Sequence, residues 1–167
     1  MKKTRLAYSL KLKLLSMLGI AWDIPRLSNS PDYYLCRFAP NRFILDNIQC
    51  GSIGGFLSAL TESNIEKQKE IYGLNNRKAE TSSSFTSEKE QNLYWNGRVY
   101  NRHGAEYQQL VRRAFQAMFD QCTSFRCALE EFGGRRLCDS SARTNTFDTV
   151  LTEQEYCSIL TDLRKQL

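Results

Sequence analysis

The stretch that decides the fold is "CGSIGGFLSAL", Cys50 to Leu60, where a short strand leads into an apolar helix. Ser52 is a candidate N-cap, because its hydroxyl can accept a hydrogen bond from an N–H group of the first turn. Gly54 and Gly55 stand in that turn, although glycine costs about 1 kcal/mol relative to alanine inside a helix. The two glycines therefore indicate that another part of the chain, or an anionic ligand, approaches the helix start closely.

Two short hairpins are predicted on either side of this corner. "RFILDNIQC" is typical of two strands joined at Asp46-Asn47, and "NLYWNGRVYNR" places the strong turn dipeptide Asn96-Gly97 between two apolar runs. Between them, "NNRKAETSSSFTSEKEQ" is the most polar part of the chain and predicts a surface loop.

The helices account for most of the remaining chain. Apolar residues recur at three- and four-residue spacing from Tyr107 to Cys122, which predicts a long helix with one buried face. A second helix is expected to end at Gly133-Gly134, and Thr152-x-x-Glu155 is a capping box that opens the last one. Strands and helices do not alternate, so we expect a predominantly helical α+β domain with short β-hairpins, not a doubly wound sheet.

Two units are expected along the chain: a basic amphipathic N-terminal helix with its linker at 1–30, and a globular domain at 31–167. Leu6, Leu10, Leu14, Met17 and Leu18 fall at helical spacing, and "WDIPRLSNSPDYY" is typical of an irregular linker. Lysines interrupt the apolar run and no A-x-A site follows, so a secretion signal is not favoured.

The net charge of +5 is concentrated at the N-terminus. Five basic residues precede the first acid, Asp23, and the rest of the chain holds 18 basic and 18 acidic residues. The five are Lys2, Lys3, Arg5, Lys11 and Lys13. The arm is interpreted as a helix docked on the domain, with a membrane-surface or nucleic-acid-binding arm as the alternative.

Cysteine and histidine usage argues against a metal site. None of the six cysteines forms C-x-x-C, and His103 is the only histidine. Scattered cysteines on apolar faces indicate reduced thiols and a cytoplasmic protein. A run of the ~20 apolar residues that span a membrane is also missing, so no membrane span is expected.

Motif chemistry alone does not identify an activity. The P-loop, the G-x-S-x-G elbow, H-E-x-x-H and the dinucleotide fingerprint are all missing from the sequence. Three irregular polar segments are candidate pocket loops, namely Ser52 to Gly55, Tyr94 to Gly97 and Asp139 to Arg143.

Four segments in order resemble the NADAR family (NAD and ADP-ribose associated), especially its phage-type branch. They are "YYLCRFAPNRFILDNIQCGSIGGFLSAL" at 33–60, "YWNGRVYNRHGAEYQQLVRRAFQAMF" at 94–119, "FRCALEEFGGRRLCDSS" at 125–141 and "TVLTEQEYCSILTDLR" at 149–164. The resemblance implies a single NADAR-like domain and cleavage of N-glycosidic bonds, either in ribosylamino nucleotides or in ADP-ribosylated guanine. It implies a carboxylate near the ribose, groups that hold phosphate and base, and room for a lysine amine that attacks the opened sugar.

This chain departs from the family pattern at polar positions. Gly54 stands where the family has glutamate, Thr61 where a lysine follows the apolar run, and Asp139 where the phage-type branch has histidine ahead of Ser140. Trp95 and Gly97 are kept.

The resemblance and these departures favour a degenerate site that binds a nucleotide or an ADP-ribose-like ligand, without a cofactor or a metal. The predicted ligand-binding residues are Arg37, Phe38, Ser52, Gly54, Trp95, Ser140 and Arg143. Trp95 is interpreted either as a base-stacking platform or as a core residue.

Two alternatives stay open. An active N-glycosidase would use a relocated acid, with Asp139 as the first catalytic candidate and Glu62 or Glu80 as others, and ADP-ribosylated nucleic acid as a substrate. A non-catalytic interaction module would use the basic arm for its partner contacts.

Overall fold

The computed structural model describes residues 7, 10–11, 14–24, 31–75, 78 and 91–167. Along the chain it forms β1 (Ala21–Asp23), the 3-10 helix η1 (Pro31–Leu35), β2 (Phe43–Leu45), β3 (Ile48–Cys50), α2 (Ile53–Ala59), α3 (Ile65–Tyr72), β4 (Asn92–Trp95), β5 (Arg98–Asn101), α5 (Ala105–Gln121), α6 (Thr123–Glu131), β6 (Arg136–Cys138) and α7 (Glu153–Arg164). Most of the polar loop at 75–91 lies outside these ranges. Glu80, Lys2, Lys3, Arg5 and Lys13 also lie outside them.

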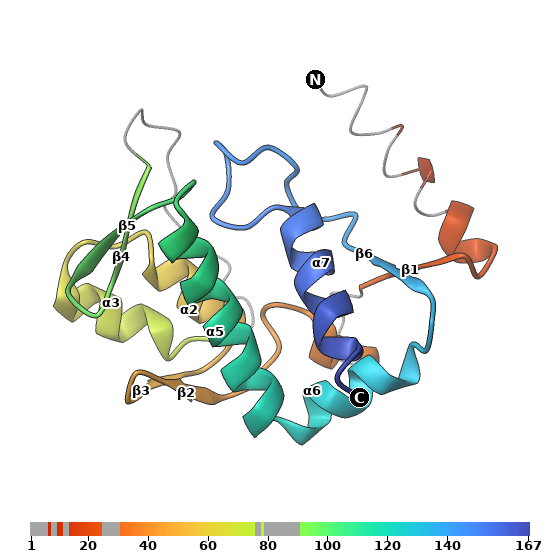
Figure 1. Ribbon diagram of the computed structural model, residues 1–167, viewed down its shortest axis with the longest axis horizontal. Helices are drawn as coiled ribbons and strands as arrows, with labels where there is room; N and C mark the ends of the chain where they lie inside the picture. The colour runs from red at the N-terminus through yellow and green to blue at the C-terminus, as the bar shows by residue number, and fades with distance from the viewer. Residues whose placement is uncertain (1–6, 8–9, 12–13, 25–30, 76–77, 79–90) are drawn as a thin grey trace.

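Helix α5 runs through the middle of the molecule and separates two groups of elements (Figure 1). Helices α2 and α3 and the two hairpins lie on one side, whereas α7, β6 and β1 lie on the other (Figure 1). The strands form three two-stranded sheets, in which β2 pairs with β3 and β4 with β5 antiparallel, while β1 pairs with β6 parallel. The predominantly helical α+β prediction is confirmed.

The local signals produce the structures that they predict. Asp46 and Asn47 have φ of 50° and 64° at the β2–β3 turn, and Asn96 and Gly97 have φ of 49° and 75° at the β4–β5 turn. These left-handed conformations match the turns that join two-residue hairpins. Helix α7 opens with the predicted capping box, in which the Thr152 side chain accepts from the Glu155 N–H group.

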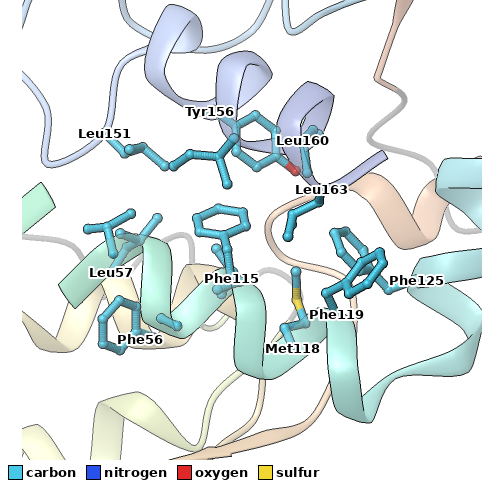
Figure 2. Packing of buried hydrophobic residues seen from close by; sticks show 14 of the residues in the cluster. Phe56, Leu57, Phe115, Met118, Phe119, Phe125, Leu151, Tyr156, Leu160 and Leu163 are labelled. Atoms are coloured by element: carbon cyan, nitrogen blue, oxygen red, sulfur yellow. The ribbon is translucent and has the colours of Figure 1, made fainter. Parts of the chain in front are cut away.

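The main hydrophobic core lies between α5, α7 and α2. Figure 2 shows Phe115 and Met118 of α5 beneath Tyr156 and Leu160 of α7, all of them buried. The spacing that predicts the long helix therefore marks the face that faces the core. None of the described helices is long and apolar enough to cross a membrane.

The glycines of the opening stretch are explained by close approaches within the chain. A Cβ on Gly55 would collide with the carbonyl oxygen of Leu74, because the chain leaving α3 crosses the start of α2. A Cβ on Gly54 would collide with the ring of Phe38. Both glycines are thus required by packing against backbone or an aromatic ring.

The parallel pair of β1 and β6 is a feature that sequence patterns did not predict. Ala21, Trp22 and Asp23 pair with Arg136, Leu137 and Cys138. The first part of "WDIPRLSNSPDYY" is therefore a strand and its end is η1, not an irregular linker throughout. The division at residue 30 stays a prediction, although residues 21–23 already pair with the domain.

Candidate functional site

An ion pair joins two segments that are far apart in the sequence. Arg37 follows η1, and Asp139 follows β6. The Nη2 atom of Arg37 lies 3.1 Å from Oδ2 of Asp139, and the two side chains are only 14% and 8% exposed. An ion pair removed from water to this extent interacts more strongly than a surface pair, but both charges lose hydration.

The ring of Tyr156, on α7, packs against the arginine of this ion pair. The guanidinium carbon of Arg37 lies 4.6 Å from the centre of the Tyr156 ring, which is within the range of a cation–π contact. The phenol donates a hydrogen bond to the carbonyl oxygen of Leu35. Burial raises the pKa of Tyr156 well above its usual value, against the nearby positive charge of Arg37. The phenol is therefore a neutral structural support.

Asp139 also accepts hydrogen bonds from its own loop. The Ser141 N–H group lies 3.1 Å from Oδ1 of Asp139, and the Ser141 hydroxyl donates to the same oxygen. Ser140 instead turns toward β1, where its N–H group and hydroxyl bind the two carboxylate oxygens of Asp23 at 2.8 and 2.5 Å. The loop after β6 is thus held by Asp139 through Ser141 and by Asp23 of β1 through Ser140.

The start of α2 reaches the site through the backbone of Arg37. The Gly54 N–H group donates to the Arg37 carbonyl oxygen at 2.6 Å, and the Gly55 N–H group donates to the Ser52 hydroxyl at 2.9 Å. These two N–H groups are therefore not free to hold an anion, and Ser52, which is 0% exposed, serves as the N-cap. The Phe38 ring covers Gly54.

Trp95 is a core residue, and the base-stacking interpretation is wrong. Its side chain is 1% exposed and meets the ring of Phe56 edge-on, with the centroids 4.9 Å apart. Its indole N–H donates to Asp46 at 3.0 Å, which ties β4 to the β2–β3 turn. Arg143 is exposed in the loop after β6 and donates to the Asp148 carbonyl oxygen.

A cleft of about 470 Å³ opens beside β6 and the first turns of α7. Its lining consists of Arg136, Leu137, Glu153, Gln154, Cys157, Ser158 and Thr161. None of these residues was predicted as a site residue from sequence. Glu153 is nevertheless only 7% exposed, and its charge acts on the same thiols as that of Asp139.

The thiols beside the cleft are poor nucleophiles. Burial, followed by the charges of Asp23 and Glu153, raises the pKa of Cys138 to about 12. Burial, followed by Glu153 and Asp139, raises the pKa of Cys157 as well. Since the thiolate is the reactive form, cysteine chemistry is disfavoured here. Within the described ranges, no three histidine, cysteine or acidic side chains are grouped to hold a metal ion.

Comparison with known families identifies the domain. The model of the family Bacteriophage protein GP30.3 matches residues 30–165. The chain belongs to this family. The GP30.3 family is of NADAR type, so the resemblance to the phage-type branch is confirmed.

One relative and one solved structure agree with this assignment. A 17.1 kDa protein from the Gp30–rIII intergenic region of Enterobacteria phage T4 is 33% identical over 140 residues, which cover 82% of this chain and 92% of that protein. The NMR structure of the E. coli protein YbiA superimposes with a TM-score of 0.55 at 14% identity, covering 84% of this chain and 80% of YbiA. At that identity, the second likeness shows the fold alone.

Of the predicted residues, Arg37 and Asp139 lie in direct contact. Phe38 and Gly54 adjoin the backbone of Arg37, and Ser140 follows Asp139 in the chain. Sequence reasoning missed Tyr156 and Glu153, because the spacing of α7 marks them only as a core residue and an N-terminal acid. It also missed Asp23, which reaches Ser140 across 117 residues.

Proposed function

We propose that this GP30.3-family domain binds a nucleotide or an ADP-ribose-like ligand and does not hydrolyse it. The observation that carries the proposal is the incomplete pairing of Arg37. Among the described residues, its guanidinium makes a single hydrogen bond, from Nη2 to Asp139. The remaining N–H groups of a nearly buried arginine are suited to a phosphate, which accepts paired hydrogen bonds.

The neighbouring groups suggest how such a ligand would be held. Asp139 is an acceptor and fits the hydroxyl groups of a ribose, whereas Arg37 fits a phosphate. Phe38 is half-buried beside them and offers an aromatic surface. Ser140 fixes the loop through Asp23, and the exposed Arg143 lies in the same loop and is a second candidate phosphate contact.

The absence of hydrolysis in this proposal rests on the start of α2. Gly54 supplies no carboxylate at the position where the family has glutamate, and the Phe38 ring fills the space into which such a side chain would extend. Thr61, at the position of the family lysine, donates its hydroxyl hydrogen to Ser58 and has no amine. General acid catalysis and attack by an amine both lose their expected groups.

Calorimetric titration with ADP-ribose, together with a hydrolysis assay on DNA carrying ADP-ribosylated guanine, tests the proposal. We expect binding without turnover, and an affinity at least about tenfold lower in Arg37→Gln. Arg112→Gln is the matched control, because Arg112 is 57% exposed and pairs with Asp162, not with Asp139. Turnover by the unaltered protein, or equal binding by Arg37→Gln, would overturn the proposal.

A second candidate is an active N-glycosidase with a relocated carboxylate. The observation that favours it is that the charges of two carboxylates, Glu153 in the cleft and Asp139 outside its lining, both raise the pKa of Cys157. Glu62 is a weaker candidate, since its carboxylate accepts from the Asn64 N–H group at the start of α3. Turnover that is lost in both Asp139→Asn and Glu153→Gln, with the fold intact by circular dichroism, would support this candidate.

A further inference from the structure

Five large apolar side chains are exposed within a short segment just before β1. Leu10, Leu14, Met17, Leu18 and Ile20 are 59%, 57%, 84%, 62% and 56% exposed. Single exposed apolar residues are common on soluble proteins, but a contiguous group marks an interaction surface. We call these five residues the N-terminal apolar face.

The backbone of this segment explains why the face points outward. Residues 7, 10–11 and 14–17 have helical conformation, and Gly19 ends the segment with φ of 69°. Leu10, Leu14 and Met17 are spaced by four and three residues, so they share one side of a helix. Leu15 lies on the other side, where it packs against Ala21 and Cys138. The segment is thus anchored by one leucine while its apolar stripe stays outside.

Charge decides which occupant suits this face. The sequence places five basic residues in the first 13 and no acid before Asp23, and Lys11 is exposed within the apolar segment itself. A second copy of the chain would bring two such positive segments together, which is electrostatically unfavourable. A nucleic acid would satisfy the charges but would leave the leucines without an apolar partner. An anionic lipid surface satisfies both, with acyl chains for the leucines and headgroups for the lysines.

We propose that the N-terminal apolar face lies on the surface of an anionic phospholipid membrane, with its side chains buried at the boundary between headgroups and acyl chains. The segment precedes residue 30, where the match to the GP30.3 family begins. It shares no residue with the ion pair of Arg37 and Asp139, although Leu15 packs against the neighbouring Cys138, and it does not depend on the proposed ligand.

Co-sedimentation of the full chain with vesicles tests the proposal. We expect the protein to sediment with vesicles containing phosphatidylglycerol and much less with pure phosphatidylcholine, and to be released as salt is raised. Leu14→Gln combined with Met17→Gln should lower binding at least about tenfold. The control is Ile65→Gln combined with Val99→Gln, because these side chains are 55% and 59% exposed on α3 and β5. This control should bind as the unaltered chain does.

Several results would overturn the proposal. One is a lack of sedimentation with anionic vesicles, and another is equal binding by the Leu14/Met17 variant and the control. A dimer in light scattering that the Leu14/Met17 variant converts to a monomer would assign the face to a second copy. Tight, salt-sensitive binding to DNA that survives the same variant, without vesicle binding, would assign the arm to nucleic acid.

Discussion

Two arginine–carboxylate pairs connect remote segments of this fold, and they differ in how completely they are satisfied. Arg102 pairs with Glu155 of α7, and Arg37 pairs with Asp139 after β6. Each guanidinium also lies against a tyrosine ring, 5.1 Å from the centre of Tyr107 for Arg102 and 4.6 Å from that of Tyr156 for Arg37. The two sites are therefore built from the same parts.

The pair at Arg102 forms a closed network, in which Nε, Nη1 and Nη2 of the arginine all donate hydrogen bonds. Its side chain is 1% exposed, Nη1 and Nη2 bind the two oxygens of Glu155 at 3.0 and 2.6 Å, and Nε binds the Thr149 carbonyl oxygen. Glu155 also accepts from Thr152 and Gln108. A fully hydrogen-bonded network of this kind fixes the start of α7 and leaves few groups for a ligand.

The pair at Arg37 is incompletely hydrogen-bonded by comparison, because its guanidinium makes one hydrogen bond within the described part of the chain and is partly accessible to solvent. What separates a structural ion pair from a candidate binding site in this domain is the number of satisfied donors on the arginine and its access to solvent, 1% for Arg102 and 14% for Arg37. The following experiments test that distinction.

The largest effect is expected from Arg102→Met. The change leaves the Glu155 carboxylate without its main partner at the start of α7, which should lower the free energy of unfolding by about 3–5 kcal/mol. Urea denaturation followed by circular dichroism measures the loss. Arg112→Met is the control, because Arg112 also joins α5 to α7 but is 57% exposed, and it should change the value by less than about 1 kcal/mol. Equal losses in the two variants would contradict the closed-network interpretation.

Gly54→Ala should have the next largest effect. The added methyl group meets the Phe38 ring next to Arg37, and such overpacking should destabilise the fold by about 1–3 kcal/mol. Phe38→Leu in the same chain should recover part of that loss, and thermal unfolding of both variants measures it. Gly134→Ala is the control, since no atom lies within 4 Å of its added Cβ. If Phe38→Leu recovers nothing, Phe38 is not what restricts position 54.

Arg37→Met should destabilise the fold less than Arg102→Met does. Among the described residues Arg37 loses one hydrogen bond where Arg102 loses three, and Asp139 keeps its bonds from Ser141, so we expect a loss of about 1–2 kcal/mol in urea denaturation. A loss as large as that of Arg102→Met would show that Arg37 is mainly structural, and would weaken its assignment to a ligand.

The smallest effect concerns pH. Burial acts to raise the pKa of Glu155, but hydrogen bonds from Arg102 and Thr152 outweigh it, so the pKa lies below its ordinary value of 4.5. A lowered pKa in the folded state means that this stabilisation is present above the ordinary value and is lost as pH falls through the folded-state pKa. The stability gap between the unaltered chain and Glu155→Gln should therefore narrow below pH 4.5 in urea titrations. A gap independent of pH would mean that the pKa is not lowered.

Sequence patterns predicted the features that depend on neighbouring residues. The caps at Ser52 and Thr152, the turns at Asp46-Asn47 and Asn96-Gly97, and α5 all follow from short-range rules. Part of the candidate site was predicted too, since Arg37 and Asp139 were both named from the family resemblance.

The features of the fold and of the candidate site that were not predicted depend on pairing between distant segments. The sequence holds no short-range pattern for such pairing. Strands of three residues, such as β1 and β6, have too few positions to show an alternation. The burial of Trp95 likewise depends on Phe56 and Asp46, which belong to other elements. The contact of Asp23 with Ser140 is another pairing of this kind.

The pairing of β1 with β6 also sets an order for folding during synthesis. Asp23 and Ser140 are 117 residues apart, so the ribosome needs roughly 6 to 23 s to reach the second after making the first, at about 5–20 residues per second. For nearly all of that time β6, the strand that pairs with β1, has not been synthesised. The loop after β6 is therefore completed among the last parts of the nascent chain, and the candidate site with it.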